Sequence, residues 1–132
     1  MRLLLDTHAL LWFANGDNRL DPYARETIIT TADNGFVSVA SIWEIAIKLR
    51  IGKLQLDDPF EEFLDRHLQP FSILPIALQH AAQTASLPLH HQDPFDRLLA
   101  AQALTESLTL VSVDGLFDAY GVTRLWSAAP RL

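Results

Sequence analysis

The apolar residues of this chain fall into short runs that are separated by stretches with helical spacing. Leu3 to Leu5 form an uninterrupted apolar run, which is typical of a strand buried on both faces. Three later runs have the same character and predict strands at residues 36–39, 71–74 and 108–113, with a short edge strand around residues 124–126. Because helical stretches separate these runs, we expect crossover connections and a parallel sheet.

Turn and capping residues mark where the intervening helices begin and end. A first helix is predicted at residues 9–14, and Asp21 followed by Pro22 is the usual start of a second one. Ser41 and Glu44 have the spacing of a capping box and predict that a third helix begins there. Further helices are predicted at residues 59–67, 76–85 and 97–104. The pattern indicates one α/β domain over the whole chain, with about four to five parallel strands flanked by helices.

The composition is that of an ordinary globular domain, with 49% hydrophobic and 20% charged residues. No apolar run approaches the roughly 18 residues that span a membrane, and Asp6 interrupts the N-terminus too early for a signal peptide. We therefore expect a cytoplasmic protein without a membrane partner. The chain has no cysteine, which excludes disulfides and thiolate metal sites. Its net charge of −6 argues against a protein that coats nucleic acid, although a local basic strip is compatible with that charge.

Four acidic residues lie at the ends of the predicted elements. Asp6 and Asp114 follow the first and fourth strands, and Glu44 and Asp96 lie in or near the first turns of helices. In a parallel α/β sheet these positions share one edge, so the four carboxylates are expected to converge. Clustered carboxylates repel one another, and a divalent cation removes that repulsion. Mg²⁺ or Mn²⁺ prefers such oxygen ligands, and it polarises a phosphoryl oxygen and lowers the pKa of bound water, as phosphodiester hydrolysis requires.

Each of these acids also has a purely structural interpretation. Asp6 is placed to cap the following helix, and Glu44 to complete the capping box with Ser41. Asp96 would complement the dipole of its helix, and Asp114 would occupy a turn. No single position decides between these interpretations, but the joint placement of the four at one edge favours a metal site.

Four sequence blocks in order carry a resemblance to a known family. They comprise residues 4–12, 38–48, 91–103 and 110–114, the last followed by Phe117. With these blocks the chain resembles a PIN-domain ribonuclease, specifically a VapC-type toxin of a type II toxin–antitoxin system. The resemblance covers almost the whole chain and implies a three-layer fold, Mg²⁺- or Mn²⁺-dependent cleavage of RNA, homodimers and a cognate antitoxin. By position, the family's catalytic and metal-binding acids fall on Asp6, Glu44, Asp96 and Asp114.

Two other functions remain open for a chain of this family. One is a housekeeping PIN nuclease that processes RNA, which the same residues would serve. The other is a non-catalytic PIN-like module that binds RNA or protein. Such a module is expected to lose one or more of the acids, so the complete set argues against it.

Residues next to the four acids have candidate supporting roles. Asp93 is either a fifth acid of the site or the N-cap residue before Pro94. Thr7 and Ser112 are placed to hydrogen-bond to site carboxylates or waters, with backbone turn bonding as the alternative. The five histidines lack paired ligand spacing, and an oxygen-rich site does not need them; His8 is the one most favourably placed to touch the site.

The densest basic cluster is Lys48, Arg50 and Lys53. It is either a solvated face or a path for the phosphates of RNA. Arg97 follows Asp96 directly, so it is expected to contact a phosphate at the metal site or to pair with the nearby acids.

The apolar residues Leu10 to Phe13, together with Ile45 and Leu49, exceed what one thin domain is expected to cover. Exposed apolar patches usually mark interfaces. We therefore expect these residues to form the contact between two copies of the chain.

Overall fold

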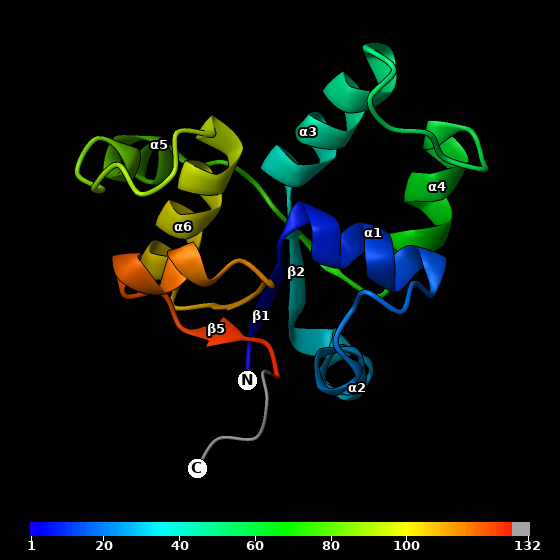
Figure 1. The fold of residues 1–132 in the computed structure, drawn as a ribbon, viewed down its shortest axis with the longest axis horizontal. Helices are drawn as coiled ribbons and strands as arrows, with labels where there is room; N and C mark the ends of the chain where they lie inside the picture. The colour runs from blue at the N-terminus through cyan, green and yellow to red at the C-terminus, as the bar shows by residue number, and fades with distance from the viewer. Residues whose placement is uncertain (128–132) are drawn as a thin grey trace.

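The computed structural model describes residues 1–127, and its centre is a five-stranded parallel sheet in the order β3-β2-β1-β4-β5 (Figure 1). β1 (Leu3–Leu5) lies in the middle and pairs with β2 (Gly35–Ser38) and β4 (Thr109–Val111). β3 (Ser72–Leu74) and β5 (Arg124–Leu125) form the edges. The three leucines of β1 are completely buried, as their uninterrupted apolar run predicted. The predicted α/β fold with a parallel sheet is confirmed.

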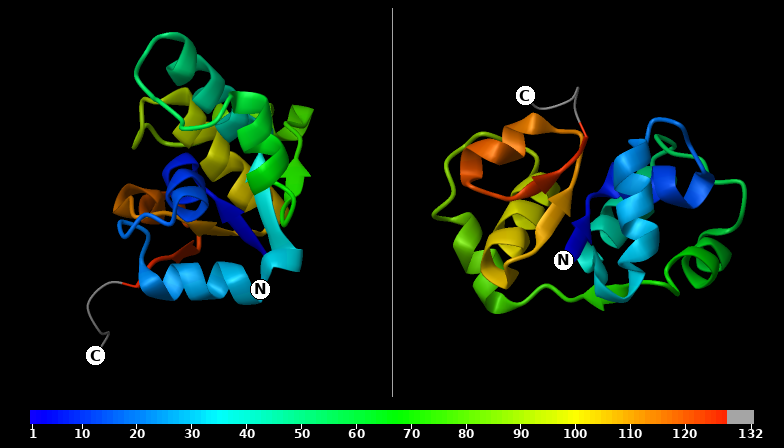
Figure 2. Two further views of the ribbon diagram at one scale, coloured as in Figure 1. Left: turned by 90° about the vertical axis from the view of Figure 1, so that its right-hand side faces the viewer. Right: turned by 90° about the horizontal axis from the view of Figure 1, so that it is seen from below.

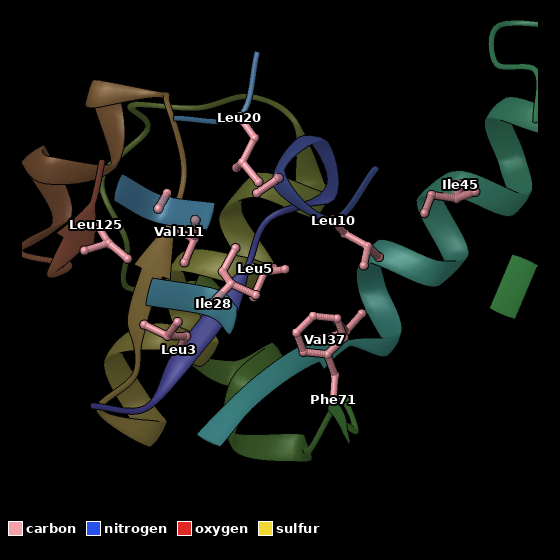
Figure 3. Close-up of a cluster of buried hydrophobic side chains, with 12 residues drawn as sticks. Leu3, Leu5, Leu10, Leu20, Ile28, Val37, Ile45, Phe71, Val111 and Leu125 are labelled. Atoms are coloured by element: carbon pink, nitrogen blue, oxygen red, sulfur yellow. The ribbon is translucent and has the colours of Figure 1, made fainter. Parts of the chain in front are cut away.

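Helices cover both faces of this sheet (Figure 2). Leu3 and Leu5 of β1 point to a core that includes residues of α1, α2 and α3, among them Leu10, Ile28 and Ile45 (Figure 3). Leu4 points to the opposite core, which α6 and η2 cover. The helices are α1 (Thr7–Asn15), α2 (Pro22–Thr30), α3 (Val39–Arg50), α4 (Phe60–His67), α5 (Leu78–Thr84) and α6 (Pro94–Glu106), with 3-10 helices η1 (Ala32–Asn34) and η2 (Gly115–Tyr120). None of the helices within residues 1–127 has the length and apolar character needed to cross a membrane.

The predicted capping box of the third helix is wrong. α3 begins at Val39, directly after β2, and its N-cap is Ser38, whose hydroxyl accepts a hydrogen bond from the backbone N–H of Ala40 (3.0 Å). Strand and helix therefore join without a loop. Ser41 and Glu44 consequently lie inside the helix, where both side chains are buried. This leaves the Glu44 carboxylate available for contacts outside its own helix.

The predicted dimer surface is also wrong. Leu10 and Ile45 are completely buried, and Leu49 and residues 11–13 pack against the same core. The exposed apolar surface of α3 lies instead on another face, in a stripe of residues four positions apart. This α3 stripe consists of Val39, Trp43 and Ile47 together with Ile51, the C-cap residue of the helix, and Trp43 is 57% exposed.

Candidate metal centre

The carboxyl ends of β1 and β4 border a small cavity of about 140 Å³, which we call the acidic cavity. Its walls come from the start of α1, from α3, from the start of α6 and from the segment between β4 and η2. All four acids of the predicted site line it, and Asp93 joins them. The lining residues are Asp6, Thr7, His8, Glu44, Lys48, Asp93, Asp96, Val113, Asp114 and Phe117.

Asp6 is fixed by the junction between β1 and α1. Its backbone N–H donates to Val111 O (3.1 Å), and its Oδ1 accepts from Ala9 N (2.8 Å). The carboxylate therefore caps α1 and also lines the acidic cavity, because capping engages only one of its oxygens. Burial raises the pKa of Asp6 above its ordinary value, and hydrogen bonds from Ser112 and Ala9 offset only part of that effect.

Glu44 is held by two partners from different elements. The Thr7 hydroxyl donates to Glu44 Oε1 at 2.7 Å and lies 3.0 Å from the Ser41 hydroxyl. Lys48 Nζ lies 2.8 Å from Glu44 Oε2, one turn further along α3. Glu44 therefore has a cationic partner on its own helix.

Asp93 and Asp96 lie together at the start of α6. Asp93 Oδ1 accepts from Phe95 N (2.7 Å) and from Asp96 N (3.2 Å), so Asp93 is the N-cap residue. The pKa of Asp96 is raised to about 6, first by burial and then by the negative charge of Asp93, with smaller contributions from Glu44 and Asp6. The capping residue thus also increases the negative charge around the acidic cavity.

Asp114 follows β4 and is held through both oxygens. Its Oδ1 accepts from Leu116 N (2.9 Å), and its Oδ2 lies 2.7 Å from His91 Nε2. The backbone N–H of Asp114 donates to Ser112 Oγ (3.0 Å), whose hydroxyl bonds to Asp6. Partial burial would raise the pKa of Asp114, but the hydrogen bonds from His91 and Leu116 outweigh it and hold the pKa below its usual value.

His91 is the site residue that the sequence interpretation missed. Its side chain is buried. His91, Asp96 and Asp114 each offer one atom that could ligate a metal, and these three atoms lie within 4.8 Å of one another. A search for histidine ligand spacing overlooks it, because its partner Asp114 is 23 residues away. The available signal was its position two residues before Asp93, in the loop that leads to Asp96.

Comparison with known proteins identifies the family. The family model described as PIN domain matches residues 3–122. The chain belongs to the PIN-domain family. None of the curated proteins compared matches it significantly.

Several solved structures share this PIN fold. VapBC2 from Rickettsia felis, bound to a DNA fragment from its promoter, has 17% identity and a TM-score of 0.69, with 95% of this chain and 98% of that chain covered. DNA-bound VapBC from Salmonella typhimurium has 16% identity and a TM-score of 0.70, covering 94% and 96%. A toxin–antitoxin complex from Klebsiella pneumoniae has 18% identity and a TM-score of 0.60, covering 85% and 86%. At these identities the likeness is one of fold.

Arg97 does not line the acidic cavity of this PIN domain, so its expected contact with a phosphate there is wrong. Its guanidinium group donates to four backbone carbonyl oxygens, those of Thr84 (2.6 Å), Pro88 (2.9 Å), Leu87 (3.1 Å) and His91 (3.4 Å). Successive residues of a helix point about 100° apart, so Arg97 and Asp96 face different surroundings. Arg97 instead holds the segment between α5 and α6 in place.

The predicted basic cluster is divided by the structure. Lys48 and Lys53 line a second cavity of about 290 Å³, whereas Arg50 lines neither this cavity nor the acidic one. Thr7, His8 and Lys48 belong to both cavities, so the two adjoin.

The donor groups of the acidic cavity fit a divalent cation. Five carboxylates and one lysine line it, so its walls carry an excess of negative charge when the acids are ionised. Oxygen ligands of this kind suit Mg²⁺ or Mn²⁺, which retain part of their hydration shell. A divalent cation would stabilise the ionised forms of Asp6 and Asp96, whose pKa values are raised without it.

Proposed function

We propose that this PIN domain is a Mg²⁺- or Mn²⁺-dependent endoribonuclease that acts as the toxin of a type II toxin–antitoxin pair. The observation that carries the proposal is the meeting of Asp6, Glu44, Asp96 and Asp114 in one cavity of about 140 Å³. These acids come from four separate segments, and an arrangement that served capping alone would not need to bring them together.

In this proposal the four acids hold the cation, and neighbouring groups orient the acids. Thr7 fixes one oxygen of Glu44, His91 fixes one oxygen of Asp114, and Ser112 links Asp6 with Asp114. A bound cation would lower the pKa of a coordinated water and polarise the phosphate. Preorganised carboxylates limit the rearrangement needed when cation and substrate arrive.

The toxin assignment within the family is supported by the similar structures. The VapBC structures and the Klebsiella pneumoniae toxin–antitoxin complex cover most of this chain. The complete acidic set favours a nuclease over a non-catalytic PIN-like module. The proposed partners are therefore an RNA substrate, a cognate antitoxin and a second copy of the chain, which we place at the α3 stripe.

The test is sequencing of RNA ends after incubation with the purified protein, Mg²⁺ or Mn²⁺, and RNA. We expect cleavage by the wild-type chain, and none in excess EDTA or with Asp6→Asn. Glu26→Gln is the matched control, because Glu26 is an exposed acid on α2 and does not line the acidic cavity. Full activity in excess EDTA would overturn the metal-dependent mechanism. Equal cleavage by wild type and Asp6→Asn would overturn the assignment of the site.

A further inference from the structure

The second cavity lies beside the acidic cavity and has the dimensions of a small binding site. Its volume of about 290 Å³ is close to the lower end of ligand pockets, about 300 Å³. It lies between α1, α3 and the residues that follow α3, and Lys48 and His8 stand at the boundary between the two cavities. A chain-like ligand that extended from the acidic cavity into the second cavity would place one of its repeating units in the second cavity.

The walls of the second cavity suit a planar, partly polar group. Leu11, Ile45 and Leu54 supply apolar surface, and Trp12 adds an aromatic ring. That ring is held by His8, with centroids 5.6 Å apart, and by the Arg19 guanidinium group 5.3 Å from the ring centre. The exposed amides of Asn15 and Gln55 complete the lining, and each amide offers hydrogen-bond donors and an acceptor. Apolar walls with a few polar groups are the usual composition of a site for an aromatic ring system.

The cationic side chains of this cavity differ in whether they are already engaged in an ion pair. Arg19 pairs with Asp17 at 2.7 Å, and Lys48 pairs with Glu44 at 2.8 Å. Lys53, in contrast, forms no ion pair with any residue in the described range 1–127. It is therefore the cation best placed to receive a phosphate next to the acidic cavity.

We propose that the second cavity binds one unpaired nucleotide of the RNA substrate, adjacent to the phosphodiester at the acidic cavity. Gln55 and Asn15 contact the edge of the base, and Lys53 contacts a phosphate. This inference rests on the proposed function, because its ligand is the RNA that the acidic cavity would cut. An unpaired base can turn out of its strand and present its edges, whereas a base within an A-form helix cannot enter a cavity of this volume.

The phosphate contact is tested by measuring the anisotropy of labelled RNA hexanucleotides over a salt series. All proteins carry Asp6→Asn, so that the RNA stays intact. Adding Lys53→Ala should reduce the slope of log affinity against log salt by about 0.7, the contribution of one phosphate contact to a single strand. Arg50→Ala is the matched control, because it removes the same charge three residues away and outside the cavity. Equal slopes for the two variants would overturn the phosphate contact.

The base contact is tested with four hexanucleotides, one for each base, in the same Asp6→Asn protein. Gln55→Ala should change the ratio between the strongest and weakest affinities by about fivefold or more, because a good bidentate contact of an amide with a base edge discriminates at least to that extent. The control is Gln69→Ala, an exposed glutamine that lines neither cavity. An unchanged ratio in Gln55→Ala would overturn the assignment of base recognition.

Parallel measurements separate this inference from the proposed function. If the wild-type chain cleaves RNA with Mg²⁺ while Lys53→Ala and Gln55→Ala bind RNA as the controls do, only the nucleotide site is overturned. If the wild-type chain neither binds nor cleaves RNA, both are overturned. If the two variants lose binding of the co-expressed antitoxin but keep their RNA affinity, the cavity receives protein and the inference is wrong.

Discussion

His91 Nε2 donates a hydrogen bond to Asp114 Oδ2 across 2.7 Å, because an ionised carboxylate can only accept. The Tyr120 oxygen accepts the backbone N–H of His91 (2.8 Å) and lies 3.0 Å from His91 Nδ1. With the ring hydrogen on Nε2, facing Asp114, Nδ1 of the neutral imidazole is an acceptor, and the Tyr120 hydroxyl donates to it. Because that nitrogen carries hydrogen, His91 orients a carboxylate of the acidic cavity and is not itself a metal ligand in this arrangement.

Tyr120→Phe should loosen Asp114 and weaken cation binding. The substitution removes the hydroxyl that donates to His91 Nδ1 and leaves the His91 backbone N–H without its acceptor. We expect the Mn²⁺ affinity, measured by calorimetry, to fall about tenfold, as for other groups that orient metal ligands. The nitrogen NMR shifts of His91 should report a mixed tautomer. Tyr23→Phe is the control, since Tyr23 is 55% exposed on α2, and an unchanged tautomer in Tyr120→Phe would contradict the prediction.

Asp96→Asn should remove a pH-dependent destabilisation of the metal-free protein. The pKa of Asp96 is about 6 in the folded chain and 3.8 ordinarily, so the folded state binds this proton more tightly than the unfolded state. The wild type should therefore lose stability relative to Asp96→Asn as the pH rises from about 4 to about 6. Solvent screening limits the difference to roughly 1 kcal/mol at neutral pH. Urea unfolding in EDTA measures it, and parallel pH curves for the two proteins would refute it.

Lys48→Met should strengthen cation binding while it weakens the metal-free fold. The lysine neutralises Glu44 in the absence of metal and competes with a cation for the same carboxylate. We expect the Mn²⁺ affinity to rise about fivefold and the metal-free stability to fall by about 1 kcal/mol. Arg50→Met, on the same helix but outside the cavity, should change neither quantity. A fall in Mn²⁺ affinity would show that Lys48 supports the site and does not compete within it.

Arg97→Lys should destabilise the fold without changing the electrostatics of RNA binding. A lysine ammonium cannot reproduce the fork with which Arg97 reaches four carbonyl oxygens. The free energy of unfolding should fall by about 2 kcal/mol, since hydrogen bonds from a charged group are among the stronger ones. Arg97→Gln, which removes the charge, should leave the salt dependence of RNA binding in the Asp6→Asn background as it is. A smaller salt slope would show that Arg97 contacts RNA. Arg66→Lys is the control for stability, because Arg66 forms an exposed ion pair with Asp58.

Trp43→Ser should weaken self-association of the chain. Trp43 is the aromatic residue of the α3 stripe and packs edge-on against Phe95, with ring centroids 5.3 Å apart. We expect wild type and Tyr23→Ser to form dimers at about tens of micromolar and Trp43→Ser to be monomeric, because exposed apolar patches mark interfaces. Light scattering measures the masses. A monomeric wild type would contradict the homodimer, and a dimeric Trp43→Ser would place the interface elsewhere.

Features set by near neighbours in the chain were predictable from the sequence. The apolar run of β1 followed by Asp6, the alternation of strands and helices, and the cap formed by Asp93 before Pro94 all depend on contacts within a few residues. Hydrophobic periodicity and helix capping act over that range. Parallel topology places strand ends and helix starts at one edge, which is why the sequence pattern alone predicts that Asp6 and Asp114 share a site.

The sequence by itself thus determined the fold class and the acids of the candidate site, while the tertiary structure decided which groups surround them. Thr7 meets Glu44 across 37 residues, and His91 meets Asp114 across 23. Only helix packing brings such residues within hydrogen-bonding distance. The direction of Arg97, the use of Ser38 in place of Ser41 as the cap, and the exposure of the α3 stripe follow from how each helix is rotated against the sheet. That rotation depends on the packing of both cores together, and no local pattern in the chain encodes it.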